Sequence, residues 1–209
     1  QFLKKNNFLA WKENIIALHK SKDSQNILSN TYKRLVFDEI CANFLSLSEN
    51  RKRIRKTKKA KVFDNQKVEF LIKKLPFKLT NSQNTVLREI DQDLLSNKRM
   101  FRIIQGDVGS GKTIVSLLSI YNVTQSGYQT ALMSPTEILA KQHFELSKKV
   151  FSNLLEIRFL TGKTEYKERK NILKELKEGK IDLIIGTHSL FQKKIEFNNL
   201  GLTVIDEQH

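Results

Sequence analysis

The sequence predicts an α/β fold with a parallel, doubly wound sheet from about residue 62 onward. Two observations lead to this prediction. Short apolar segments alternate there with helical segments, and a glycine-rich loop joins one expected strand to a helix. Alternation of this kind places parallel strands between layers of helices. The first part of the chain shows helical patterns only.

The expected strands are short and apolar enough to be buried on both faces of a sheet. They are residues 101–105, 130–134, 156–160, 181–185 and 202–206. The helices between them are expected from the glycine-rich loop to about Ser126, from Pro135 onward, and from about Thr164 to Glu178. Gly127 and Gly179 end two of these helices, and proline is common in a first helical turn.

Residues 1–61 are expected to form a helical linker segment and a basic tether, followed by a nucleotide-binding domain over residues 62–209. Apolar residues recur at helical spacing in the first segment, which predicts a packed amphipathic helix. They are Leu35, Phe37, Ile40, Cys41, Phe44 and Leu47. Residues 51–61 carry eight basic side chains and no acid. Such a run is either a solvated tether or helix end, or a phosphate-binding segment.

The composition favours a polyanionic partner without proving one. The formal net charge is +15 and the pI about 9.8, which suits nucleic acid but also a lysine-rich genome. One cysteine, Cys41, excludes an internal disulfide and fits a reducing cytoplasm. No apolar stretch is long enough to predict a membrane span. Because the chain begins at Gln1 and ends on an acidic motif, we expect a piece of a longer protein.

The glycine-rich loop is a complete phosphate-binding loop of the form GxxxxGK[ST]. It consists of Gly106, Asp107, Val108, Gly109, Ser110, Gly111, Lys112 and Thr113. Its glycines let backbone N–H groups surround an anion, and the following helix adds its positive N-terminus. Lys112 is expected to reach the β and γ phosphates of ATP, and the Thr113 hydroxyl to bind Mg²⁺.

A second motif, which is acidic, follows the last expected strand. Asp206 and Glu207 stand where that strand ends, which places them at the carboxyl edge of the sheet beside the loop. Asp206 is expected to hold Mg²⁺, and Glu207 to orient or deprotonate the attacking water. Lys112, Asp206 and Glu207 are therefore the expected catalytic residues.

These motifs resemble those of the RecG family, bacterial DNA helicases of the DExH type in superfamily 2. The DExH box is Asp206, Glu207, Gln208 and His209. The other matching stretches are residues 105–113, 135–143 and 186–188, together with residues 75–80 and Gln83. Residues 8–12, 18–19, 34–35 and 38–39 resemble the segment between the family's DNA-binding wedge and its motor. The region around residues 50–65 matches loosely.

The resemblance implies a RecA-like domain, truncated after the DExH box, that belongs to an ATP- and Mg²⁺-dependent DNA helicase. Such an enzyme remodels stalled forks and Holliday junctions in recombination and repair, as a monomer in the bacterial cytoplasm at the nucleoid. These 209 residues alone are expected to be inactive, because the second motor lobe supplies an arginine to the reaction. Ser110, Glu137 and Gln208 favour RecG over the similar transcription-repair coupling factor.

The resemblance also implies roles for single residues. Gln83 is expected to contact adenine, although Thr80-x-x-Gln83 also has the spacing of a helix capping box. The expected DNA-binding residues are Pro135, Thr136, Glu137, Thr161, Gly162, Gly186 and Thr187. His143 and His188 are interpreted as structural. The alternatives left open are a phosphate-loop ATPase that binds no nucleic acid and an inactive DNA-binding module.

Overall fold

The computed structural model describes residues 6–20, 29–56, 63, 68–96, 99–192 and 195–207. The chain divides into two compact units, Gln1–Lys58 and Lys59–His209, and each is treated by itself. The expected domain boundary at residues 61–62 lies outside the described residues. No helix in the described ranges is long and apolar enough to cross a membrane.

The described residues of the first unit form the helices α2 (Trp11–Lys20) and α3 (Asn30–Lys56), so the predicted helical character is confirmed there. The buried Asn14 of α2 donates a hydrogen bond from Nδ2 to the carbonyl of Thr31, at 3.0 Å. Arg34 of α3 forms an ion pair with Asp38 at 2.8 Å and donates to the carbonyl of Leu9. These contacts join α2 to the first turns of α3.

The predicted packing of α3 is wrong within this unit. Its middle turns extend beyond the contacts with α2, so Ile40, Phe44 and Leu47 stay exposed, Phe44 by 69%. The helix continues through Lys56, so the basic run begins as a helix end. Residues 57–61 of that run lie outside the described residues.

The second unit contains a parallel sheet in the order β2-β3-β1-β4. Its strands are β1 (Gln129–Met133), β2 (Ile157–Leu160), β3 (Leu183–Gly186) and β4 (Leu200–Ile205). Four of the expected strands are therefore present, each shifted by no more than three residues. The predicted parallel sheet is confirmed.

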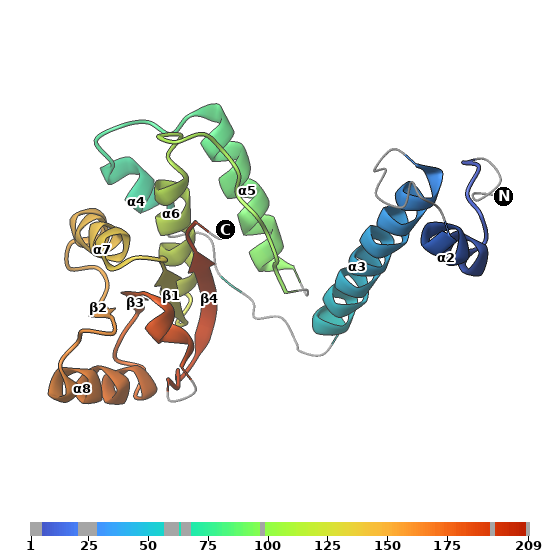
Figure 1. Ribbon diagram of the computed structural model, residues 1–209. Helices are drawn as coiled ribbons and strands as arrows, with labels where there is room; N and C mark the ends of the chain where they lie inside the picture. Colours follow the sequence, from blue (N-terminus) through green and yellow to red (C-terminus); the bar gives the residue numbers. More distant parts are fainter. Residues whose placement is uncertain are drawn as a thin grey trace. The chain divides into compact units, whose positions relative to one another are not determined.

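The expected strand at residues 101–105 is wrong. This segment precedes the phosphate loop and pairs with no strand in the described part of the chain. Arg102 instead forms ion pairs with Glu89 and Asp93 of α5 (Asn81–Leu95), the latter at 2.8 Å. The segment thus runs beside α5, as Figure 1 shows, with Ile103 exposed by 79%. The two ion pairs hold its backbone against a helix, away from the sheet.

Helices cover both faces of the sheet (Figure 1), which confirms the doubly wound arrangement. One face packs against α4 (Val68–Lys74), α5, α6 (Lys112–Gln125) and α7 (Glu137–Phe151). The other packs against α8 (Tyr166–Lys177) and the short helix η1 (His188–Phe191). Successive residues of β1 show the alternation: Leu132 joins the first core, and Ala131 and Met133 join the second. Two-sided burial fits β1 and β3, which are buried along their whole length. It is wrong for β4, which ends the strand order and leaves Thr203 and Ile205 exposed.

Candidate functional site

The turns that follow the parallel strands lie at one edge of the sheet. Reading across the order β2-β3-β1-β4, they begin with Thr161, Thr187, Ser134 and Asp206. In parallel α/β sheets this carboxyl edge is where ligands bind. The structure therefore brings the turns of the expected DNA-binding residues to the same edge as Asp206 and Glu207. The DNA-binding turns follow β2, β3 and β1, and the acidic motif follows β4.

The phosphate loop is an exposed turn before α6, built on two glycines in the left-handed region. Gly109 and Gly111 both have φ of +82°, which side-chain-bearing residues rarely adopt, and Gly111 is the N-cap of α6. Lys112 folds over the loop, donating from Nζ to the carbonyls of Gly106 at 2.7 Å and Asp107 at 2.8 Å. The loop thus presents a cation and a helix N-terminus in one place, as an anion site requires.

Gln83 connects α5 to this loop. Its amide nitrogen donates to the carbonyl of Ser110 at 3.0 Å, while its Oε1 accepts from the backbone N–H of Thr80 at 2.9 Å. The Thr80 hydroxyl accepts in turn from the N–H of Gln83, so the capping box is present. A Cβ on Gly111 would lie 2.3 Å from the Gln83 side-chain nitrogen, so a larger residue there would have to displace the end of that side chain. The adenine contact of Gln83 stays a prediction.

Both the backbone and the side chain of Asp206 are held by hydrogen bonds. Its N–H donates to the carbonyl of Met133 at 2.8 Å, which extends the pairing of β4 with β1. Its Oδ2 lies 2.7 Å from Nε2 of the buried His143 on α7. Glu207 follows with a φ of +50° and an exposed side chain. Gln208 and His209, the rest of the DExH box, lie outside the described residues.

The residues at this edge fit a magnesium ion. Mg²⁺ prefers oxygen ligands, and it usually takes one or two from protein side chains and the rest from phosphates and water. Asp206 offers a carboxylate and Thr113 a hydroxyl. No cluster of three or more His, Cys, Asp or Glu suited to a metal occurs in the described part of the chain. In a magnesium site of this kind the remaining ligands would come from phosphates and water.

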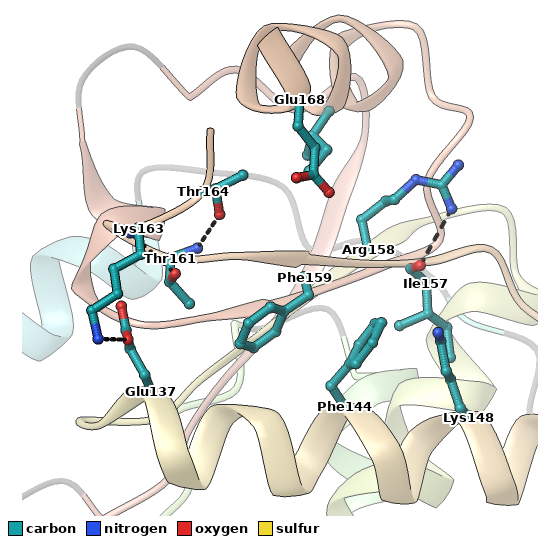
Figure 2. A pocket seen from close by; sticks show the side chains of 11 residues that line it. Glu137, Phe144, Lys148, Ile157, Arg158, Phe159, Thr161, Lys163, Thr164 and Glu168 are labelled. Atoms are coloured by element: carbon teal, nitrogen blue, oxygen red, sulfur yellow. Dashed lines mark hydrogen bonds and ion pairs between the residues drawn. The ribbon is translucent and has the colours of Figure 1, made fainter. Parts of the chain in front are cut away.

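The turns after β1 and β2 are joined by an ion pair that the sequence analysis missed. Glu137, at the start of α7, lies 2.7 Å from Nζ of Lys163 (Figure 2). The Lys163 ammonium lowers the pKa of Glu137, chiefly through this hydrogen bond. Thr136 caps α7 by accepting from the N–H of Leu139 at 3.3 Å. The helix therefore begins at Glu137, two residues after Pro135.

An open cavity of about 540 Å³ lies over β2, between α7 and α8. Figure 2 shows Glu137 and Lys163 at one end of it and the rings of Phe144 and Phe159 between α7 and β2. Thr161 lines the cavity too, and its N–H donates to the Thr164 hydroxyl at 3.0 Å. The cavity thus opens at the turn after β2 and does not include the phosphate loop.

Two residues of this edge were not assigned from the sequence. Lys163 follows the Thr161-Gly162 turn directly, so its position beside an expected DNA contact was the available signal. His143 lies on the buried face of α7 with Ala140, Ser147 and Phe151, as suits its interpretation as a structural residue. Its partner Asp206 is 63 residues away and becomes a neighbour only through the pairing of β1 with β4.

Comparisons with known proteins agree with this geometry. A family model described as "DEAD/DEAH box helicase" matches residues 80–209. The chain is 44% identical to the "ATP-dependent DNA helicase RecG" of Aquifex aeolicus over 203 residues and 40% identical to that of Thermotoga maritima over 211 residues. These matches cover 92% and 100% of this chain, and 25% and 27% of the relatives. The chain thus spans about a quarter of their length.

Solved structures give the same result. A structure of RecG bound to a three-way DNA junction matches with a TM-score of 0.79 at 39% identity, over 99% of this chain and 28% of that one. A hypothetical ATP-dependent RNA helicase from Sulfolobus tokodaii matches at 20% identity with a TM-score of 0.51, over 68% of this chain and 41% of that one. The second likeness concerns the fold alone. The predicted RecA-like fold and the resemblance to RecG are confirmed, and the chain belongs to the DEAD/DEAH box helicase family.

Proposed function

We propose that the protein containing this chain is an ATP-dependent DNA helicase that remodels branched DNA, such as stalled forks and Holliday junctions. One observation carries the proposal: a single sheet edge presents both the acidic pair Asp206 and Glu207 and three consecutive turns suited to a DNA backbone. The relatives named RecG and the structure of RecG on a three-way junction support the choice of DNA and of a branched substrate.

On the nucleotide side, the phosphate loop binds ATP through its backbone N–H groups and Lys112. The Lys112 ammonium exchanges the carbonyls of Gly106 and Asp107 for oxygens of the β and γ phosphates. Mg²⁺, held by Thr113 and Asp206, supplies positive charge that offsets the charge of the phosphates. Glu207 orients the attacking water and accepts its proton. Gln83 holds the loop at Ser110 beside the expected position of the base.

On the DNA side, the turns offer hydrogen-bond donors to phosphates. The N-terminus of α7 presents N–H groups near Thr136, and the exposed Gly162 and the Thr187 hydroxyl lie at the ends of β2 and β3. We call these three turns, which follow β1, β2 and β3, the DNA track. Contacts of this kind position a nucleic acid without reading its sequence. That fits an enzyme that moves along DNA.

In this proposal Glu137 does not contact the DNA directly. A carboxylate repels a phosphate, and this one is already paired with Lys163. Glu137 therefore acts through Lys163, which is 85% exposed along its side chain and free to face the DNA. The two residues connect the turn after β1 to the turn after β2.

A matched pair of lysine variants in the intact protein tests the DNA track. Lys163→Ala removes a phosphate contact, so the slope of log affinity for forked DNA against log salt should fall by about 0.7 to 0.9. Lys177→Ala is the control, because Lys177 forms a similar exposed ion pair with Glu196, at 2.6 Å, at the far end of α8. Equal slopes for the two variants would contradict the placement of the track.

The broader test is the ATPase activity of the intact protein with and without forked DNA, together with displacement of a strand from the fork. Stimulation by forks and displacement of the strand are expected. ATP hydrolysis that ignores DNA would indicate a phosphate-loop ATPase of another kind. Binding of DNA without hydrolysis would indicate an inactive DNA-binding module. A translocase that moves on duplex DNA without separating strands would favour the transcription-repair coupling type.

A further inference from the structure

His143 is a buried polar side chain whose position is explained by one contact. It lies on the inner face of α7, with only 10% of its side chain exposed. Its Nε2 is 2.7 Å from Oδ2 of Asp206, which is 32% exposed along its side chain. A carboxylate oxygen only accepts, so the ring donates and its Nε2 carries the hydrogen. A charge-assisted bond of this length is stronger than a bond between neutral groups.

The bond restricts Asp206 at the place where its orientation matters. The backbone of Asp206 is already held by Met133, and the imidazole fixes the side chain by one oxygen. The second oxygen, Oδ1, is thereby left for a ligand at the open edge of the sheet. Side chains that hold a metal-binding carboxylate in this way typically contribute a factor of about 10 to 100 in metal affinity.

We infer that His143 is a positioning residue for the magnesium-binding carboxylate of Asp206. The inference rests on the nucleotide site of the proposed function and adds a residue that this site had not included. In this inference His143 acts through Asp206. It also joins α7, whose first turn faces the DNA track, directly to the ATP site.

Nucleotide binding by the intact protein tests the inference without relying on turnover. The measurement is the affinity for a fluorescent ADP analogue, with Mg²⁺ and with EDTA. His143→Leu keeps the volume and loses the donor, whereas His143→Gln keeps an N–H donor. Ser147→Ala is the control, because Ser147 lies one turn further on the same buried face and its hydroxyl has no partner among the described residues.

The expected result is a selective loss of the magnesium-dependent part of binding. His143→Leu should raise the Mg²⁺ concentration at half-saturation by about 10-fold or more. Its affinity for the nucleotide in EDTA should stay at the wild-type value. His143→Gln should recover most of the loss, and Ser147→Ala should behave as wild type in both conditions.

Three results would overturn the inference while leaving the proposed function intact. They are an unchanged Mg²⁺ requirement in His143→Leu, an equal loss with Mg²⁺ and EDTA, and a failure of His143→Gln to recover binding. An equal loss in both conditions would mean that His143 only supports the fold. Wild-type protein that binds nucleotide equally with and without Mg²⁺ would instead overturn the proposed nucleotide site, and the inference with it.

Discussion

Replacing Gly186 with alanine should destabilise the sheet strongly, and the reason is a close approach of backbone to backbone. A Cβ at Gly186 would lie 1.9 Å from the carbonyl oxygen of Leu160 in β2 and 3.1 Å from its carbon. Gly186 and Leu160 are register partners, so the methyl group would enter the pairing of β2 with β3. Neither group is the end of a flexible side chain, so a strand has to move.

The magnitude follows from what that movement would break. Overpacking of a close-packed site costs about 1 to 3 kcal/mol. Displacing β2 would also weaken at least one backbone hydrogen bond, worth about 1 kcal/mol. The free energy of unfolding should therefore fall by about 2 to 4 kcal/mol, which in a domain of this size lowers the Tm by about 5 to 15 °C.

Thermal unfolding followed by circular dichroism measures the change, and Gly162→Ala provides the control. Gly162 follows β2 at the same edge of the sheet, but a Cβ there would have no atom within 4 Å. Its Tm should stay close to that of the wild type. A Gly186→Ala protein as stable as Gly162→Ala would show that β2 and β3 do not approach as described, and the order of turns along the edge would need revision.

Three further predictions concern the nucleotide site and the DNA track. Lys112→Ala should lower the ATPase rate of the intact protein by about 100-fold or more, and a rate near wild type would contradict the role of the loop. Gln83→Ala should weaken ATP and GTP equally if Gln83 acts only through Ser110, and ATP more strongly if it contacts adenine, as competition binding would show. Lys163→Ala should return the depressed pKa of Glu137 toward its ordinary value in an NMR titration. Because Glu137 has the lower pKa in the folded state, its ion pair stabilises at neutral pH and is lost as the pH falls through that folded pKa.

The sequence predicts most of the sheet because two independent signals agree there. Short apolar runs mark the strands, and the phosphate loop and the acidic pair have a fixed place in an α/β fold. Both signals also predict a strand at residues 101–105, which are apolar and precede the phosphate loop, and there the prediction is wrong. In the structure Arg102 of that segment pairs with Glu89 and Asp93 of α5 instead. The spacing of apolar residues carries no information on such contacts.

The apolar face of α3 shows a second limit of sequence patterns. Ile40, Phe44 and Leu47 have the spacing of a buried stripe, but the spacing does not say which element covers it. In its own unit α3 meets α2 only near its first turns, so these side chains remain exposed. Their pattern predicted the helix correctly and its packing wrongly.

The order of the strands explains why the contact between His143 and Asp206 could not be predicted. The chain visits β1, β2 and β3 before β4, yet β4 pairs with β1. The helix α7 follows β1, and Asp206 follows β4, so the two are adjacent only because of this pairing. Helix α8 follows β2, which is separated from β4 by both β3 and β1. Helix α7, and not α8, is therefore placed to contact the acidic motif, and it does so through His143.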